Sequence, residues 1–491
     1  MMSSYDLPGE PALKFLSAFR EALDEGNAAL FCGAGVSVGA GFEDWRSLLI
    51  EIARDLALDV DRTDLISLAQ YGLNQRGRNH INERILDKFV ALAKPNDLQN
   101  GIARLPIDHV WTTNFDSSLE ECYRKHGRIV DIKTDEVSLS HHKRGADVTV
   151  YKMHGDASQP NNAIITKEDY ETYALSKRGQ VFSIALQTDL ISRTFLFLGF
   201  SFSDPNLDQI LSRVRYLIGE SQREHYAIMK RPKSPEGTSG TERAELSHEW
   251  KRTELQIEDL EKRYKIRTVL VDEYEEIPKL VAKLGAISRR STVFVSGAIA
   301  SYGAMPKPRF DSLVLSIGER LESEGMGLVC GLGVGVGAVV SQGFFLSAYT
   351  KGRASGADRA TLRPFPQPAT GEGDVREFWA THRRDMIGRA GFIIFAAGNK
   401  LDDVTGAIVR SNGMDQELTI ALEEGAYPIP IGVTGDVAAE FLERFSADPF
   451  RYYGSANVSP DLETLGRANA TNGEIVDAVF NIIRKVNESR F

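Results

Sequence analysis

The first half of the chain places small or polar residues directly after several short apolar runs. The run 28–32 (AALFC) leads into a glycine-rich segment that contains Gly33, Ala34, Gly35 and Ser37. Such a segment is either a tight strand-to-helix turn or a loop that brings ligand phosphates against backbone N–H groups. The composition of this stretch alone does not decide between the two.

Three further apolar runs end in side chains that could take part in catalysis. The runs and the residues after them are 109–113 with Asn114 and Asp116, 147–153 with His154, and 194–200 with Ser201. The ordinary pKa of histidine suits a general base near neutral pH. Asn114 and Asp116 could instead cap the next helix. Ser201 could begin a turn, and His154 could satisfy a local hydrogen bond.

These residues meet only if the apolar runs belong to one sheet. The runs are apolar throughout and alternate with segments of helical spacing, which favours parallel strands covered by helices on both faces. In open sheets of this kind, ligands bind in the crevice at the carboxyl ends of the strands. The sequence therefore predicts that the glycine-rich loop, Asn114, Asp116, His154 and Ser201 converge at one edge of a sheet.

The chain is long enough for two domains of this kind. Its 491 residues exceed what one hydrophobic core usually serves. The strand-and-loop pattern restarts after about residue 286, and we place the boundary within 283–291. We expect α/β domains at 1–285 and 290–491, each a mainly parallel sheet flanked by helices. A long charged helix at 241–264 is expected to present a solvated face.

Composition and charge argue against several classes of function. The formal net charge is −10, so a basic surface that follows nucleic-acid phosphates is not expected. The longest apolar run, 326–340, is too short and too rich in glycine to span a membrane. Cys32, Cys122 and Cys330 form no Cys-x-x-Cys pair. This argues against a bound metal and against disulfides, and we expect a soluble protein of the reducing cytoplasm.

Four motifs follow one another along the first half of the chain: Gly33-Ala34-Gly35-Val36-Ser37, Thr112-Thr113-Asn114-Phe115-Asp116, His154-Gly155 and Gly199-Phe200-Ser201. In these motifs and in their order, the chain resembles the sirtuin (SIR2) family. Residues 41–46 (GFEDWR) also resemble that family's Gly-Ile-Pro-Asp-Phe-Arg element. The resemblance covers roughly residues 10–285 and implies a Rossmann-like NAD site.

The resemblance to sirtuins also implies a role for each motif residue. The dinucleotide would lie against Gly33, Ala34, Gly35, Ser37, Asp44, Arg46, Gly199 and Ser201. Asn114 and Asp116 would lie at the nicotinamide ribose, and His154 would be the general base. A neutral amide such as Asn114 can hold a water or a ribose hydroxyl without titrating.

One departure from the sirtuin pattern bears on the reaction. Sirtuin deacylases carry a four-cysteine zinc module after the His-Gly motif, whereas residues 156–180 of this chain contain no cysteine. That module helps to form the acyl-peptide cleft, so its absence speaks against peptide deacylation and leaves the NAD-cleaving core. Two alternatives stay open: a sirtuin-like NAD-dependent protein deacylase, and a module that binds NAD without cleaving it.

The second half contains three apolar segments rich in small residues: 293–298 (VFVSGA), 331–338 (GLGVGVGA) and 395–400 (FAAGNK). In these segments the second half resembles the SLOG family of Rossmann-like folds that bind nucleotide-derived ligands. The catalytic Pro-Gly-Gly-x-Gly-Thr loop of enzymatic relatives is missing, which favours a sensor. The resemblance implies pyrophosphate loops at Ser296, Gly297, Gly333 and Gly335, and ligand contacts from Arg383, Lys400 and Glu417. Arg363 is a further candidate anion contact, and of Arg383 and Arg384 only one can face a pocket.

A SIR2 half followed by a SLOG half resembles the NAD-consuming effector family of the Thoeris anti-phage system. Supporting segments are 151–156 (YKMHGD), 197–215 (FLGFSFSDPNLDQILSRVR), 362–367 (LRPFPQ) and 383–387 (RRDMI). In that family, a TIR-domain partner makes a cyclic ADP-ribose isomer, the SLOG half binds it, and the SIR2 half then destroys NAD. The resemblance implies an NAD+ glycohydrolase that releases nicotinamide and ADP-ribose and forms a homo-tetramer or larger homo-oligomer.

Overall fold

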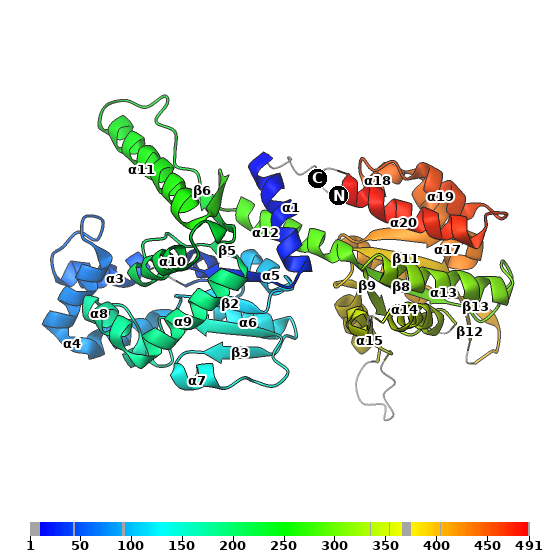
Figure 1. Ribbon diagram of the computed structural model, residues 1–491, viewed down its shortest axis with the longest axis horizontal. Helices are drawn as coiled ribbons and strands as arrows, with labels where there is room; N and C mark the ends of the chain where they lie inside the picture. The colour runs from blue at the N-terminus through cyan, green and yellow to red at the C-terminus, as the bar shows by residue number, and fades with distance from the viewer. Residues whose placement is uncertain are drawn as a thin grey trace. The chain divides into compact units, whose positions relative to one another are not determined.

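The computed structural model describes residues 10–42, 45–90, 94–333, 335–352, 354–365, 375–402 and 404–489. The chain divides into two compact units, residues 1–285 and 286–491. Each unit is a parallel sheet with helices packed around it, and we describe the two units separately (Figure 1). This architecture confirms the predicted α/β class.

A seven-stranded parallel sheet forms the centre of the first unit, in the order β3-β4-β2-β1-β5-β6-β7. Its strands are β1 (Ala28–Cys32), β2 (His109–Thr112), β3 (Val130–Lys133), β4 (Val148–Lys152), β5 (Thr194–Leu198), β6 (His225–Lys230) and β7 (Ile266–Val271). Every residue of β1 and β5 is buried, as expected for apolar strands covered on both faces. Because β2 and β5 flank β1, the strand order reverses at β1, and open sheets bind ligands at such a point.

Helices surround the sheet of the first unit. They are α1 (Glu10–Asp24), α2 (Gly35–Val38), α3 (Trp45–Asp55), α4 (Leu65–Phe89), α5 (Asp97–Ala103), α6 (Ser118–Lys125), α7 (Glu136–Ser140), α8 (Lys167–Leu175), α9 (Lys177–Ser192), α10 (Pro205–Ile218), α11 (Gly240–Tyr264) and α12 (Glu276–Ser288). Most of α11 is exposed, and its N-terminal part projects from the unit (Figure 1). Only Leu260 and Tyr264 of this helix are buried, which matches the predicted solvated face.

Helices α3 and α4 anchor the loops that follow β2 and β4. Ile52 of α3 and Ile85 of α4 belong to one buried apolar cluster with Phe115 and Ala157. Phe115 separates the two polar candidates of the loop after β2. Packing of this one apolar side chain therefore helps to fix where that loop presents its polar groups.

The second unit contains a five-stranded parallel sheet in the order β10-β9-β8-β11-β14. Its strands are β8 (Thr292–Ala298), β9 (Gly327–Cys330), β10 (Ala360–Leu362), β11 (Phe392–Ala397) and β14 (Tyr427–Ile431). A separate antiparallel hairpin joins β12 (Asn399–Leu401) to β13 (Ile408–Arg410). All six residues of β11, which lies between β8 and β14, are buried.

The helices of the second unit pack closely on this sheet and on each other. They are α13 (Lys307–Ser323), α14 (Gly337–Thr350), α15 (Val375–Ile387), α16 (Asn412–Glu423), α17 (Asp436–Ala447), α18 (Pro449–Tyr453), α19 (Ser459–Gly466) and α20 (Asn472–Glu488). A Cβ on Gly318 would come within 2.1 Å of the Val340 carbonyl oxygen, so only glycine lets α13 approach α14 this closely. Among the described residues, no helix is both long and apolar enough to cross a membrane.

Candidate functional site

The loops that follow β1 and β5 touch through their backbones. The Gly33 N–H donates to the Leu198 carbonyl oxygen (2.9 Å), and the Gly35 N–H donates to the Gly199 carbonyl oxygen (3.0 Å). A Cβ on Gly33 would come within 2.4 Å of that Gly199 oxygen, and Gly199 itself has a φ of +61°. Backbone contact between the two loops therefore requires glycine at these positions, in addition to any role in binding a ligand.

Asn114 connects the loop after β2 to this glycine loop. Its Nδ2 donates to the Gly33 carbonyl oxygen (2.9 Å) and to Ser37 Oγ (3.0 Å). Its backbone N–H donates to Thr112 Oγ1 (3.0 Å). Because Nδ2 holds the side chain in place, the carbonyl oxygen Oδ1 is left to accept a hydrogen bond from a ligand. The structure thus brings Asn114, Gly33 and Ser37 together as the sequence predicts.

His154 reaches the same edge of the sheet from β4. Thr112 of β2 pairs with Lys152 of β4, and Asn114 and His154 each follow two residues later. The His154 ring is 3% exposed. The rings of Tyr170 and Tyr173 lie edge-on to it, with centroids 5.5 and 6.4 Å away.

The electrostatic partner of His154 is Asp204, which caps the N-terminus of α10. His154 Nε2 lies 3.3 Å from Asp204 Oδ2 and makes no aligned hydrogen bond within the described part of the chain. The Tyr170 hydroxyl donates to the same Oδ2 (3.1 Å). Burial lowers the pKa of His154, although the Asp204 carboxylate opposes that shift. The imidazole is therefore neutral at neutral pH, as a general base must be.

Asp116 has a structural partner in the next helix. Its Oδ1 accepts hydrogen bonds from the Ser118 N–H (3.0 Å) and the Ser118 hydroxyl (2.5 Å) at the start of α6. The side chain is 4% exposed. Asp116 therefore makes the contacts expected of a residue that caps the next helix. Its contact with a ribose hydroxyl remains a prediction.

The other residues predicted to contact the dinucleotide are more exposed. Ser201 is exposed and its Oγ lies 2.7 Å from Ser203 Oγ. Arg46 lies at the start of α3 and pairs with the exposed Asp61. Ala34 is half-buried in the turn between β1 and α2. Asp44 lies outside the described residues.

The second unit brings Ser296, Arg383 and Glu417 together. The Ser296 hydroxyl donates to Glu417 Oε2 (2.5 Å), and Arg383 Nε lies 3.5 Å from Glu417 Oε1. The Arg383 guanidinium also lies over the ring of Phe365, 4.9 Å from its centroid. Burial raises the pKa of the Glu417 carboxyl. Polar side chains of β8, α15 and α16 thus meet at one place.

The glycines predicted near this cluster pack backbone against backbone at the carboxyl ends of β8 and β9. A Cβ on Gly333 would come within 2.5 Å of the Gly297 carbonyl oxygen, and Gly335 has a φ of +79°. Lys400, on the hairpin strand β12, is exposed. The loops after β8 and β9 and the hairpin after β11 thus carry the predicted residues around one end of the sheet.

The two remaining arginine candidates have partners away from Glu417. Arg384 is exposed and pairs with Glu423 (2.7 Å) and Glu424 (3.4 Å). Arg363 pairs with Asp385 of α15. Of the two neighbouring arginines on α15, Arg383 is therefore the one that faces the Ser296–Glu417 cluster.

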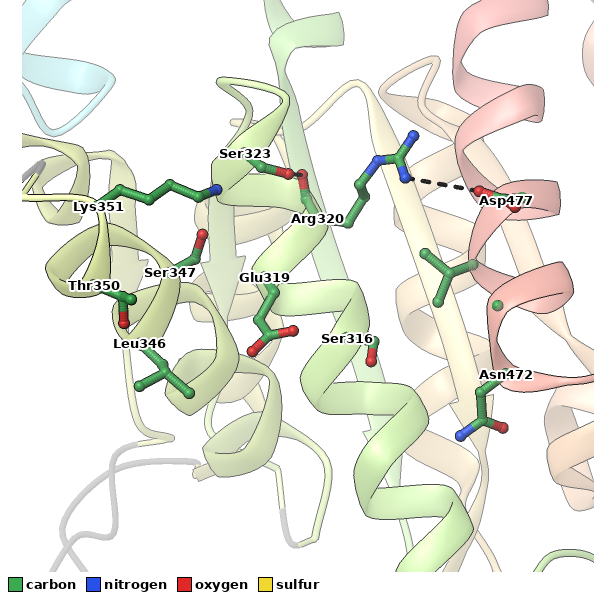
Figure 2. A pocket seen from close by; sticks show the side chains of 12 residues that line it. Ser316, Glu319, Arg320, Ser323, Leu346, Ser347, Thr350, Lys351, Asn472 and Asp477 are labelled. Carbon is green, nitrogen blue, oxygen red and sulfur yellow. Dashed lines mark hydrogen bonds and ion pairs between the residues drawn. The ribbon is translucent and has the colours of Figure 1, made fainter.

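A groove of about 600 Å³ lies elsewhere in the second unit (Figure 2). Its lining residues are Ser316, Glu319, Arg320, Ser323, Leu346, Ser347, Thr350, Lys351, Asn472, Gly473, Val476 and Asp477. They come from the last turns of α13 and α14 and the first turns of α20, whereas Ser296 and Glu417 lie at the carboxyl ends of strands. Arg320 pairs with Glu324 and Asp477, and Lys351 pairs with Glu322. The cationic groups of this groove are thus already neutralised by carboxylates.

Sequence reasoning missed the groups that surround His154. Asp204 and Tyr170 were not predicted, and the only available signal was the Asp-Pro pair that commonly begins a helix. Among the described residues, no three or more His, Cys, Asp or Glu side chains are grouped so that they could hold a metal ion.

Comparisons with known proteins divide the chain in the same order as its folded units. Residues 108–268 match the SIR2-like domain family. Residues 276–486 match the Sir2- and TIR-associating SLOG family.

Several curated proteins are similar over nearly the whole chain. An NAD(+) hydrolase ThsA from Cytobacillus dafuensis is 35% identical over 488 residues, which covers 97% of this chain and 97% of that protein. The NAD(+) hydrolase ThsA of Bacillus cereus (strain MSX-D12) is 37% identical over 446 residues, which covers 90% of this chain and 91% of that protein. That of Acinetobacter baumannii (strain 532279) is 36% identical, with 95% and 96% covered.

Proposed function

Because this chain belongs to the family of the ThsA NAD(+) hydrolases, we propose that a cyclic nucleotide switches its first unit on to cleave NAD+. Its first unit is SIR2-like and its second is of the SLOG type, and its role is in defence. NAD+ is the substrate, and nicotinamide and ADP-ribose are the expected products. The proposed signal is a cyclic ADP-ribose isomer made by a TIR-domain partner.

The chemistry of NAD+ determines what the first unit must supply. The nicotinamide ring is cationic in NAD+ and becomes neutral when it leaves, so no acid is needed to protonate the leaving group. The transition state at the ribose carbon resembles an oxocarbenium ion, as in glycoside cleavage. The protein must orient the ribose, position a water and accept its proton.

Asn114 and His154 divide these tasks. Asn114 Oδ1 accepts a hydrogen bond from a ribose hydroxyl or from the attacking water. Asp204 faces His154 Nε2 and favours the tautomer that carries a proton there, so Nδ1 accepts the proton of the water. The C–N bond breaks with its electron pair going to nicotinamide, and the water oxygen bonds to the ribose carbon. The observation that supports this division is the position of the buried His154, two residues past β4 and in register with Asn114 two residues past β2.

Product analysis tests this function against its two alternatives. The purified full-length chain is incubated with NAD+, with and without cyclic ADP-ribose isomers, and nicotinamide and ADP-ribose are separated by chromatography. We expect little NAD+ loss without the signal and rapid nicotinamide release with it. Transfer of an acetyl group from an acetyl-lysine peptide at a comparable rate would favour a deacylase. Intact NAD+ after long incubation with every isomer would favour a non-catalytic module.

The second unit is the proposed sensor. Arginine grips phosphate in a bidentate fashion, and Arg383 lies beside the buried Glu417 and over the aromatic Phe365. Glu417 would accept from ribose hydroxyls or an adenine amine. The family description, which associates this SLOG type with TIR proteins, supports the assignment of the signal to a TIR-domain enzyme.

The proposal includes a homo-tetramer or larger homo-oligomer formed through the first unit. The exposed apolar side chains of α7, α8 and α9 are Val137, Leu175, Val181, Ile184 and Ile191. Exposed apolar side chains in such number on neighbouring helices often mark a protein–protein contact. Light scattering of the purified chain, whose mass is 54.3 kDa, measures the oligomer directly.

Asp204→Asn should shift the acid limb of the kcat/KM profile to lower pH. Catalysis stops when His154 takes up a proton, and the Asp204 carboxylate is the charge that favours this protonation. Without it, burial and the nearby Arg178 both lower the pKa of His154, so more acid is needed. Asparagine keeps an acceptor for the Leu207 N–H, and its amide nitrogen can donate to the Tyr170 hydroxyl oxygen in place of the carboxylate oxygen that accepts from it.

The pH dependence of kcat/KM for NAD+ measures this shift. Asp208→Asn is the matched control, because Asp208 lies on the same helix and bonds to the Tyr264 hydroxyl instead. An acid limb that stays in place or moves to higher pH in Asp204→Asn would show that Asp204 does not act on the base.

A further inference from the structure

A lysine is buried directly beneath the candidate catalytic loops. Lys152 is the last residue of β4, and its side chain is 0% exposed. Its Nζ donates to the carbonyl oxygens of Phe115 (3.1 Å) and Asp116 (2.6 Å). The same ammonium pairs with Glu120 (2.9 Å) and Asp156 (2.5 Å). The proposed reaction gives this charge no role.

The four partners of Lys152 come from three separate segments. Phe115 and Asp116 belong to the loop that carries Asn114, Glu120 lies in the first turn of α6, and Asp156 follows His154 by two residues. The Ala157 N–H also donates to the Phe115 carbonyl oxygen (2.9 Å). One ammonium group therefore ties the loop of Asn114 to the loop of His154.

Stability alone does not account for this arrangement. Taking the Lys152 ammonium and the Glu120 carboxylate out of water is costly, and well-packed apolar side chains often stabilise a core as well or better. The geometry is specific, since two of the four contacts are with the main chain of a loop rather than with a counter-charge. Those two contacts fix the position of the loop relative to the end of β4.

We propose that Lys152 is a positioning residue that holds Asn114 at the correct separation from His154 for NAD+ cleavage. The proposal rests on the proposed function. Because a displacement of about 1 Å can cost 10²-fold in rate, loss of the two carbonyl contacts should lower kcat by about that factor. The KM for NAD+ should change much less, because the glycine loop after β1 keeps its own contacts.

A simpler explanation is that Lys152 only neutralises Glu120 and Asp156. The two explanations predict different kcat values when Lys152 and Glu120 are both replaced by uncharged residues. Lys152→Met alone leaves the buried Glu120 carboxylate without its ion pair, while the partly buried Asp156 keeps its bonds from Ser158. This variant should destabilise the first unit under either explanation. Lys152→Met/Glu120→Gln removes one positive and one negative charge, so most of the lost stability should return.

The decisive comparison is between Lys152→Met/Glu120→Gln and Lys152→Gln/Glu120→Gln. Methionine and glutamine have nearly the same length and neither is charged, but only the glutamine amide can donate to the Phe115 or Asp116 carbonyl oxygen. We expect similar Tm values for the two variants. The methionine variant should show a kcat about 100-fold below that of the wild-type chain, and the glutamine variant should recover part of that loss.

Lys133→Met is the matched control for removing a buried lysine. Lys133 is 4% exposed at the end of β3 and pairs with Asp131 (2.8 Å) and the His141 carbonyl oxygen. Its loss should lower Tm while kcat per folded molecule stays close to that of the wild-type chain.

The outcomes separate this proposal from the proposed function. Equal kcat values in the methionine and glutamine variants, or a methionine variant within threefold of the wild-type kcat, would overturn the positioning role while NAD+ cleavage by the wild-type chain stands. A wild-type chain that cleaves no NAD+ with any signal nucleotide would overturn both. If the glutamine variant fails to fold, kcat of the methionine variant against the wild-type chain still decides the matter. If the methionine variant fails to fold, Lys152→Leu/Glu120→Gln, which also has no donor at position 152, takes its place.

Discussion

Replacing His154 with alanine should lower the rate of signal-activated NAD+ cleavage by about 10²–10⁴-fold, the usual contribution of a general base. The buried ring lies against Asp204, and burial lowers its pKa; alanine removes the imidazole that takes the proton from water. Nicotinamide release under saturating signal nucleotide measures the effect.

His225→Ala is the matched control for the loss of a buried histidine. Burial lowers the pKa of His225 to about 3, and its ring accepts a hydrogen bond from the Phe195 N–H. His225 begins β6, at the opposite end of the strands from His154. Its variant should lose stability but keep its turnover per folded molecule. Near-wild-type turnover in His154→Ala would reject the assignment of the base.

Asn114→Ala should be comparably inactive for a different reason. Its amide joins Gly33 to Ser37, so alanine removes both the ligand acceptor and a contact that shapes the glycine loop. KM should therefore rise together with the loss of kcat, whereas His154→Ala should change mainly kcat. Asp116→Ala is a less informative variant, because Asp116 also bonds to the start of α6.

The sheet of the first unit was only partly predictable from the sequence. The sequence predicts β1 and β5, because each is an apolar run that is followed by glycine. β3 (VDIK) was not predicted, because Asp131 and Lys133 interrupt the apolar pattern. Those two residues are buried as an ion pair (2.8 Å). Their pairing satisfies the charges but leaves no trace in hydrophobic periodicity.

The sequence predicts where the site lies but not which side chains contact one another there. Parallel strands deliver their following residues to one edge, which is enough to bring Asn114 near the glycine loop. The contacts of Lys152 with Phe115 and Glu120 join positions more than 30 residues apart. The pairing of His154 with Asp204 spans a longer stretch of chain. Such pairings depend on loop conformation, and no local pattern of one sequence encodes that conformation.

Arg383→Ala should make the second unit respond only to much higher concentrations of the signal nucleotide. A charged hydrogen bond to phosphate contributes about 1.5–3 kcal/mol, which corresponds to roughly ten- to a hundredfold in affinity. Calorimetry with cyclic ADP-ribose isomers measures the affinity, and NAD+ loss against signal concentration measures activation. Arg384→Ala, the neighbouring exposed arginine paired with Glu423 and Glu424, should leave both curves unchanged.

The signal nucleotide can activate the protein only if its affinity differs between the resting and the active state. A ligand shifts an equilibrium only by binding the active state more tightly than the resting one, and a nearly complete switch needs several kcal/mol of such difference. In the structure Arg383 faces Glu417, so a bound phosphate would compete with that carboxylate for the guanidinium. If Arg383 only binds the signal, the activation curve of Arg383→Ala moves to higher concentration but reaches the wild-type plateau. A lowered plateau at saturation would show that the exchange of partners at Arg383 is itself part of the switch, and unchanged activation would remove Arg383 from the signal site.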